Sequence, residues 1–167
     1  FGSQVCTPSG WCFSHPKPQG ITLNGVFARR PNDVWAVGDN GSIVHFDGTH
    51  WASRWMGTTP YDLRGVLESA GNSAWAVGAV GIVLRFNGST WTEFGETEFG
   101  HDLTSIWGID SEHIWAVGNQ GGRQWDGQQW SDVEGLPPHL RAVFGGSAND
   151  IWVAGDSGAL FRWQEGS

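Results

Sequence analysis

Positive charge is scarce in this chain of 167 residues. It has 9 lysines and arginines against 17 aspartates and glutamates, for a formal net charge of −8, and Lys17 is the only lysine. An acidic surface repels the phosphate backbone of nucleic acids, so we expect no nucleic-acid partner. Long apolar runs are missing too, because none approaches the roughly 18 residues that a membrane-spanning helix needs. We therefore expect no membrane insertion.

Cysteine is scarce as well, with only Cys6 and Cys12 in the chain. A disulfide between them is the simplest interpretation, and it favours an oxidising compartment, so we expect a secreted or cell-surface protein. Two free thiols in a reducing cytosol are the alternative. A metal site at these cysteines would need further ligands, and no nearby histidine or cysteine pattern supplies them.

Sequence motifs of catalysis are missing. There is no G-x-S-x-G nucleophile elbow, no phosphate-binding P-loop, no H-E-x-x-H zinc helix and no EF-hand loop. The six histidines are scattered without the spacing of metal ligands. The sequence therefore favours a protein that is not an enzyme, with a hydrolase or lyase as the less favoured alternative.

Glycine and tryptophan, in contrast, are abundant, with 26 and 12 residues. Short strands joined by tight turns have this composition, which indicates an all-β fold. The signature Trp-Ala-Val-Gly begins at Trp35, Trp75 and Trp115, and Trp-Val-Ala-Gly begins at Trp152, at intervals of 40, 40 and 37 residues. The chain thus contains four tandem repeats in a single domain over residues 1–167. Their boundaries are about 23–62, 63–102, 103–139 and 140–167.

Each repeat predicts four antiparallel strands. A leucine lies twelve residues before each signature tryptophan and opens a short apolar strand, and the signature forms the second strand. A Gly-x-x-Gly turn follows, in which glycine can adopt positive φ without steric cost. An alternating segment forms the third strand, and an Asp-Gly or Asn-Gly turn leads to a fourth strand at a further tryptophan. Four strands in about forty residues make one blade of a β-propeller.

The fourth repeat stops before its final tryptophan, and the N-terminus supplies a candidate replacement. Trp11 lies twelve residues before Leu23, just as Trp51 lies twelve residues before Leu63. We therefore predict a four-bladed β-propeller whose last blade is completed by an N-terminal strand at about residues 11–14, which closes the ring and removes exposed sheet edges. This prediction favours a monomer over a homodimer. A larger ring of two chains, in which this strand completes the neighbour's blade, is the alternative.

The repeat resembles the tryptophan-rich, WAVG-type β-propeller repeats of secreted or surface bacterial proteins, on the motifs W-A-V-G and F-[D/N]-G-x-x-W between residues 11 and 166. It is more distantly similar to sialidase-type and tachylectin-like propellers. The resemblance implies the fold but not the activity, because propellers host binding, lectin and catalytic functions. The sialidase Asp-box has one residue between Asp and Gly, whereas Asp47 and Asp126 directly precede a glycine. The resemblance therefore implies no catalytic residue.

Loops that join one repeat to the next are the least repetitive segments, and we expect them to lie on one face, beside the Gly-x-x-Gly turns. Variable loops on a rigid scaffold are where function usually resides. These loops carry aromatic, acidic and histidine side chains that suit stacking on a sugar or contact with a peptide. Packing of the loop aromatics between blades is the alternative. The candidate ligand-binding residues are Trp55, Tyr61, Phe99, His101 and Asp39.

A second constellation consists of the residues directly before the first-strand leucines, namely Thr22, Asp62, Asp102 and His139. In a closed ring they would converge near one mouth of the central channel, where a calcium ion or another cation could bind. Solvated loop residues are the alternative.

These observations together favour a secreted or surface binding module without enzymatic activity. Its ligand is a glycan, which would make it a lectin, or a protein. The alternative is a structural or assembly domain of a larger surface protein.

Overall fold

The computed structural model describes residues 7–12, 20–54, 59–69, 72–94 and 100–163. Within these residues, fifteen strands form four antiparallel sheets. The sheets are the blades of a four-bladed β-propeller, which confirms the predicted all-β fold.

The strands of each sheet follow one another in chain order. Blade 1 contains β1 (Leu23–Arg30), β2 (Asp33–Gly38), β3 (Ile43–Phe46) and β4 (Trp51–Ser53). Blade 2 contains β5 (Leu63–Ser69), β6 (Ser73–Gly78), β7 (Val83–Phe86) and β8 (Trp91–Glu93). Blade 3 contains β9 (Leu103–Gly108), β10 (Ile114–Gly118), β11 (Gly121–Trp125) and β12 (Trp130–Val133). Blade 4 contains β13 (Leu140–Ser147), β14 (Asp150–Gly155) and β15 (Leu160–Arg162).

Each blade has two faces, because side chains alternate along a strand. We call the face that carries the signature tryptophan the signature face, and the other the opposite face. In blade 1, Phe27, Trp35 and His45 form one cross-strand row of the signature face. Val26, Ala36 and Val44 form the neighbouring row, on the opposite face.

The core lies between the blades. The signature face of blade 1 packs on the opposite face of blade 2, so that Trp35 and Val37 share an apolar cluster with Val66 and Leu84. The same arrangement joins blade 2 to blade 3 and blade 3 to blade 4. The repeated tryptophans are therefore mainly structural, as the repeat predicts.

Three of the four Gly-x-x-Gly turns, those of blades 1, 2 and 4, form the short 3-10 turns η1 (Asp39–Gly41), η2 (Ala79–Gly81) and η3 (Asp156–Gly158). The second glycine has positive φ, at 69° in Gly41, as predicted. The first glycine of the turn is needed for space and not for positive φ. Gly38 is extended, and a Cβ there would overlap the carbonyl oxygen of Thr22, at the start of the same blade.

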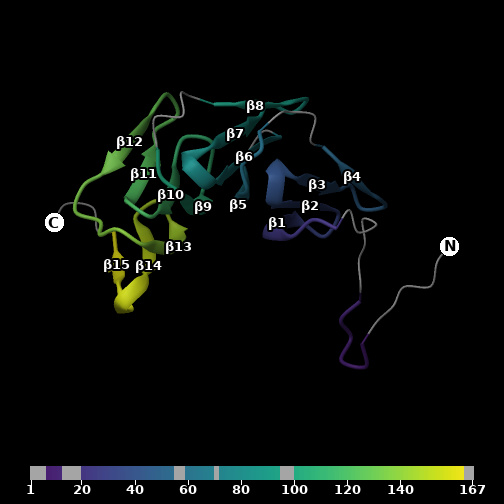
Figure 1. Ribbon diagram of the computed structural model, residues 1–167, viewed down its shortest axis with the longest axis horizontal. Coiled ribbons are helices and arrows are strands. Elements are labelled where there is room, and N and C mark those ends of the chain that lie inside the picture. The colour runs from purple at the N-terminus through teal and green to yellow at the C-terminus, as the bar shows by residue number, and fades with distance from the viewer. Residues whose placement is uncertain (1–6, 13–19, 55–58, 70–71, 95–99, 164–167) are drawn as a thin grey trace.

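The blades follow one another along an arc, from blade 1 to the yellow blade 4 (Figure 1). Their first strands contact each other in sequence, β1 with β5, β5 with β9 and β9 with β13. Blade 1 therefore keeps its opposite face exposed at one end of the arc, with Val26 on its surface. Blade 4 keeps its signature face exposed at the other end, with Phe144 and Trp152 on its surface.

The part of the N-terminus that the structure describes does not complete blade 4. The sheet of this blade has three strands among the described residues, in the order β13-β14-β15, and the side chain of Trp11 is 79% exposed. In Figure 1 the segment 7–12 lies beyond blade 1, far from β15. The prediction of a closing strand is thus wrong for Trp11 and Cys12, because the open arc separates them from the edge of β15; residues 13 and 14 lie outside the described residues.

Two further expectations concern covalent links and the membrane. Cys6 lies outside the described residues, so its disulfide with Cys12 stays a prediction. In the part of the chain that the structure describes, no helix has the length and apolar character needed to cross a bilayer.

Candidate functional site

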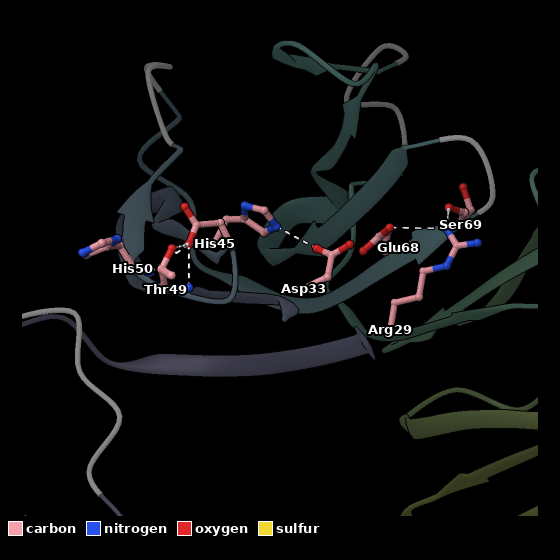
Figure 2. Close-up of polar contacts among 8 residues, drawn as sticks. Arg29, Asp33, His45, Thr49, His50, Glu68 and Ser69 are labelled. Carbon is pink, nitrogen blue, oxygen red and sulfur yellow. Dashed lines mark hydrogen bonds and ion pairs between the residues drawn. The ribbon is translucent and has the colours of Figure 1, made fainter. Parts of the chain in front are cut away.

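A cleft of about 370 Å³ lies at the junction of blades 1 and 2. Polar side chains dominate its lining, which also includes the buried Trp35 and the partly buried Phe86. Figure 2 shows that His45, Asp33, Glu68 and Arg29 follow one another in a row here. The lining residues are Asn32, Asp33, Trp35, His45, Asp47, Arg54, Glu68, Asn72, Ala74, Phe86, Gly88 and Ser89.

Blade 1 contributes a paired histidine and aspartate. Asp33 begins β2 and His45 lies on β3, and their Oδ1 and Nε2 atoms are 2.7 Å apart. The imidazole stacks on the signature Trp35, with 4.1 Å between ring centroids. The same two positions of blade 4 hold Asp150 and Arg162, which form an ion pair of 2.8 Å. This pair is therefore a recurring structural device that covers the signature tryptophan.

Blade 2 brings Glu68, on β5, against this pair. Its side chain is only 6% exposed. Arg29 donates from Nη1 to Glu68 Oε1 at 3.3 Å and to the Ser69 carbonyl oxygen at 2.9 Å. The second oxygen, Oε2, is buried without a hydrogen-bond partner among the described residues. Burial and then the charge of Asp33 raise the pKa of Glu68.

Glu68 departs from the repeat. The residues at its position in blades 1, 3 and 4 are Ala28, Gly108 and Gly145. The scaffold therefore accepts a small neutral residue at this place, and nothing in the fold requires a carboxylate. Glu68 is not among the site residues predicted from the sequence. The signal was present in the sixth residue of each first-strand segment, LNGVFA, LRGVLE, LTSIWG and LRAVFG.

Asp47 adds a third carboxylate to the lining of the cleft, in the Asp-Gly turn of blade 1. Its Oδ1 accepts hydrogen bonds from the backbone N–H groups of His50 and Thr49, at 2.8 Å each, and from the Thr49 hydroxyl at 2.7 Å. These bonds hold the pKa of Asp47 well below its usual range. Asp47 is therefore ionised at any physiological pH.

None of the predicted ligand-binding residues that the structure describes lines this cleft. Trp55 and Phe99 are outside the described residues. Tyr61 is exposed, and Asp39 accepts a hydrogen bond from the Asn24 side chain at 2.9 Å. His101 lines a second cleft, of about 330 Å³, which also includes Asp102, Gln120 and Arg123. Of this set, the structure places Tyr61, His101 and Asp39 outside the lining of the first cleft, and ligand binding by the set stays a prediction.

Two of the predicted cation ligands join neighbouring blades. Asp62 accepts a hydrogen bond from the backbone N–H of Asn40 at 3.0 Å. Asp102 accepts one from the backbone N–H of Val80 at 2.9 Å and one from Arg64 Nη1 at 2.7 Å. The Val80 amide first, and then the Arg64 guanidinium, lower the pKa of Asp102. Each carboxylate therefore ties the start of its blade to the turn of the preceding blade.

The other two predicted ligands make main-chain contacts. The Thr22 carbonyl oxygen accepts a hydrogen bond from the Asp39 amide, and the His139 amide donates to the Asn119 carbonyl oxygen. Within the described residues, no three His, Cys, Asp or Glu side chains gather in a way that could hold a metal ion. Calcium or another cation at the channel mouth stays a prediction.

Comparison with known proteins places the fold but not the family. No family model and no curated protein matches the chain. The solved structure "YCF48 bound to D1 peptide" matches with a TM-score of 0.70 and 18% identity, over 90% of this chain and 53% of that one. YCF48 from Cyanidioschyzon merolae matches with 0.65 and 17%, over 91% and 56%. Virginiamycin B lyase from Staphylococcus aureus matches with 0.65 and 12%, over 90% and 58%.

This chain therefore spans just over half the length of these three proteins. At such low identity the similarity shows the β-propeller fold alone. The resemblance to WAVG-type, sialidase-type and tachylectin-like proteins stays a prediction.

Proposed function

We propose that this chain is a non-enzymatic binding module for a protein ligand, and that a lysine or arginine side chain of the ligand enters the cleft between blades 1 and 2. Glu68 carries this proposal. It is a buried carboxylate whose Oε1 pairs with Arg29 and whose Oε2 has no hydrogen-bond partner among the described residues, at a position where the other blades have alanine or glycine. A charge in such a place costs free energy unless a partner compensates it.

The cleft has the charge that a cationic group needs. Asp33, Asp47 and Glu68 line it, and Arg54 is the arginine of the lining. Two opposite charges 4 Å apart attract by about 1 kcal/mol in bulk water but by about 4 kcal/mol at the effective dielectric constant near a protein surface. A guanidinium or ammonium group held beside Glu68 would therefore stabilise its ionised form. The volume of about 370 Å³ suits one long side chain.

The histidine of the cleft is poorly placed for catalysis. His45 Nε2 contacts Asp33, and Nδ1 is buried without a hydrogen-bond partner among the described residues. A general base must reach the proton that it abstracts, and neither ring nitrogen is free to meet a substrate. This geometry supports binding rather than turnover.

The comparisons are compatible with this proposal without deciding it. One similar structure contains a bound peptide, and another is a lyase. A shared propeller fold hosts both functions, so the choice rests on the chemistry of the cleft. A glycan is the second candidate, because Asn32, Asn72 and Ser89 offer amide and hydroxyl groups in the same cleft. A secreted or surface location is part of the proposal.

Titration with small probes tests the site. We expect N-acetyl-arginine amide and N-acetyl-lysine amide to shift the backbone NMR signals of Trp35 and Ala74. N-acetyl-citrulline amide has the shape of the arginine probe without its charge, and it should bind about tenfold more weakly, as loss of one charge-assisted contact implies. Glu68→Gln should weaken binding of both cationic probes by a similar factor.

Two variants serve as controls. Glu93→Gln removes an exposed carboxylate from β8, and Asp126→Asn changes the blade 3 counterpart of Asp47; neither should alter binding. Equal binding of the citrulline and arginine probes, or full binding by Glu68→Gln, would contradict the proposal. Methyl glycosides that shift the same signals, with no effect of the cationic probes, would instead favour a lectin.

A further inference from the structure

The signature tryptophan has a different environment in the last blade. Trp35, Trp75 and Trp115 are at most 7% exposed, because the next blade covers each of them. Trp152 occupies the same strand position in blade 4 and is 39% exposed. Phe144 lies beside it on the same face and is exposed too. Blade 4 thus presents a complete packing surface with nothing on it among the described residues.

The first blade has the reverse asymmetry. Val66, Ile106 and Val143 lie on the opposite faces of blades 2, 3 and 4, and they are at most 8% exposed beneath the preceding blade. Val26, at the same position of blade 1, is 71% exposed. The two ends of the arc are therefore the two halves of the interface that recurs inside the chain.

Aromatic geometry shows that the receiving half is already formed. Trp35 contacts Phe86 and Trp91 of the next blade, with ring centroids 5.1 and 5.3 Å away. Phe86 and Trp91 are 5.4 Å apart at an interplanar angle of 35°. Phe46 and Trp51 have the same arrangement on blade 1, at 5.4 Å and 36°. Blade 1 therefore carries the ring pair that receives a signature tryptophan.

We infer that the signature face of blade 4 docks on the opposite face of blade 1 of a second copy of this chain, so that two chains close into one eight-bladed ring. Such a contact joins different surfaces of the two chains, and it forms a closed ring when the rotation between copies returns to the start. Two arcs of four blades related by a twofold axis close in this way when each arc spans half of the ring. Eight blades lie within the range known for propellers.

Polar groups at the two ends also match. Asn24 donates to Asp39 of its own turn and to the Leu63 carbonyl oxygen of the next blade. Arg141 and Asp156 occupy the corresponding positions of blade 4, joined by two bonds of 2.8 Å. In the two-chain ring Arg141 therefore faces the Leu23 carbonyl oxygen of the second copy.

The N-terminal segment fits the same arrangement. Trp11 has the sequence spacing of a fourth-strand tryptophan in a blade that precedes blade 1. In a two-chain ring the preceding blade is blade 4 of the other copy, which has three strands among the described residues. Trp11 is exposed, and the segment 7–12 that contains it lies beyond blade 1 and not near blade 4 of its own chain (Figure 1).

Mass measurement of the 167-residue chain by light scattering is the first test. We expect the mass to rise to that of two chains as the protein concentration increases. A chain that stays monomeric at every concentration would overturn the inference. The exposed faces of blades 1 and 4 would then be surfaces that further repeats of the same polypeptide could cover.

Charged variants then test the head-to-tail geometry. Val26 corresponds to Ile106, and Phe144 corresponds to Leu67; Ile106 and Leu67 share one apolar cluster across an internal interface. Val26→Lys and Phe144→Glu should each give monomers. Mixed together, they should form a heterodimer, because one interface pairs the two charges and the other is unchanged.

Controls separate assembly from folding. Val26 and Phe144 are exposed in the single chain, so both variants should keep the circular dichroism spectrum of the parent; Ala142→Glu, on the same face as Phe144, provides a second variant. Ile109→Lys changes an exposed apolar residue of blade 3 and should stay dimeric. Dimers that survive both face variants, or a mixture that stays monomeric, would rule out the head-to-tail contact.

Discussion

At the scale of the residue, Glu68 is a charge added to a repeated scaffold. The other blades show that Ala or Gly satisfies the fold at its position, so the carboxylate has no packing role there, and its burial burdens stability because, among the described residues, Arg29 pairs with only one of its two oxygens. Such burdens are typical of functional sites, where local rules of folding are broken for another purpose. The nearby Asp33–His45 pair does recur in blade 4 as Asp150–Arg162, and it is therefore a weaker indicator of function.

The titration of Glu68 should appear in the pH dependence of stability. Because burial raises its pKa, the folded state binds the proton more tightly than the unfolded chain does. The contribution of Glu68 is fully present below the pKa of the unfolded chain and is lost as pH rises through the raised pKa. We expect Glu68→Gln to gain free energy of unfolding relative to the parent between acid and neutral pH, as measured by urea denaturation. Glu93→Gln should follow the parent, and parallel profiles for Glu68→Gln and the parent would refute this reasoning.

The backbone of Val80 is strained. Its φ of 49° lies in the left-handed region, which is unfavourable for a β-branched side chain. The corresponding residues of blades 1 and 4 are Asn40 and Ser157. Asparagine tolerates this conformation, so we expect Val80→Asn to raise the free energy of unfolding by about 1 kcal/mol.

Thermal and urea denaturation would measure this gain. The bond from the Val80 amide to Asp102 involves only the backbone and should persist in the variant. Ile109→Asn also replaces an exposed apolar residue with asparagine and controls for the change in polarity. A gain of similar size in Ile109→Asn would mean that backbone strain is not the cause.

At the scale of the element, carboxylates tie the first strand of one blade to the turn of the blade before it. Asp102 accepts two hydrogen bonds, one from an arginine, and Asp62 accepts one from a backbone amide. We expect Asp102→Ala to cost about 1–2 kcal/mol of stability and Asp62→Ala about half as much. Chemical denaturation of the two variants would measure the difference, and equal costs would show that Arg64 adds nothing.

The same carboxylate has a pH signature of opposite sign to that of Glu68. Because its pKa is lowered in the folded state, the stability that Asp102 provides is present above the pKa of the unfolded chain and is lost as pH falls through the lowered value. The stability curves of the parent and Asp102→Asn should therefore converge in acid. Curves that stay separated at low pH would show that the ionised carboxylate is not the source.

At the scale of the whole molecule, the repeat made the blades predictable. Equal spacing of leucine, tryptophan and glycine determines which residues pair across the strands, and the structure has these strands in the expected places. The candidate site was harder to predict. Variation among the loops led to loop residues as candidates, whereas Glu68 lies on a strand. Comparing the four repeats position by position would have found it.

Closure of the ring could not be predicted in the same way. Spacing shows which blade a strand resembles, but it does not show the angle between blades, which depends on how side chains of neighbouring sheets pack. Trp11 has the right spacing for a fourth strand, and yet the segment 7–12 lies beyond blade 1, far from β15. The burial of Val26 and Trp152, compared with their counterparts in the inner blades, carries the information that spacing lacks.

Uneven coverage should also produce uneven local stability. Blades 2 and 3 are packed on both faces, whereas blades 1 and 4 are each packed on one, and in a repeat architecture stability depends on neighbouring interfaces. We therefore expect the amides of β6 and β10 to exchange with deuterium more slowly than those of β2 and β14 in a dilute sample.

If two chains assemble, rising concentration should protect β2 and β14 and leave β6 and β10 unchanged. Mass spectrometry of peptic fragments would follow each strand, and Phe144→Glu should abolish the concentration dependence. Protection that is equal in all four strands at every concentration would contradict the open arc itself, whereas unequal protection that ignores concentration would contradict only the assembly.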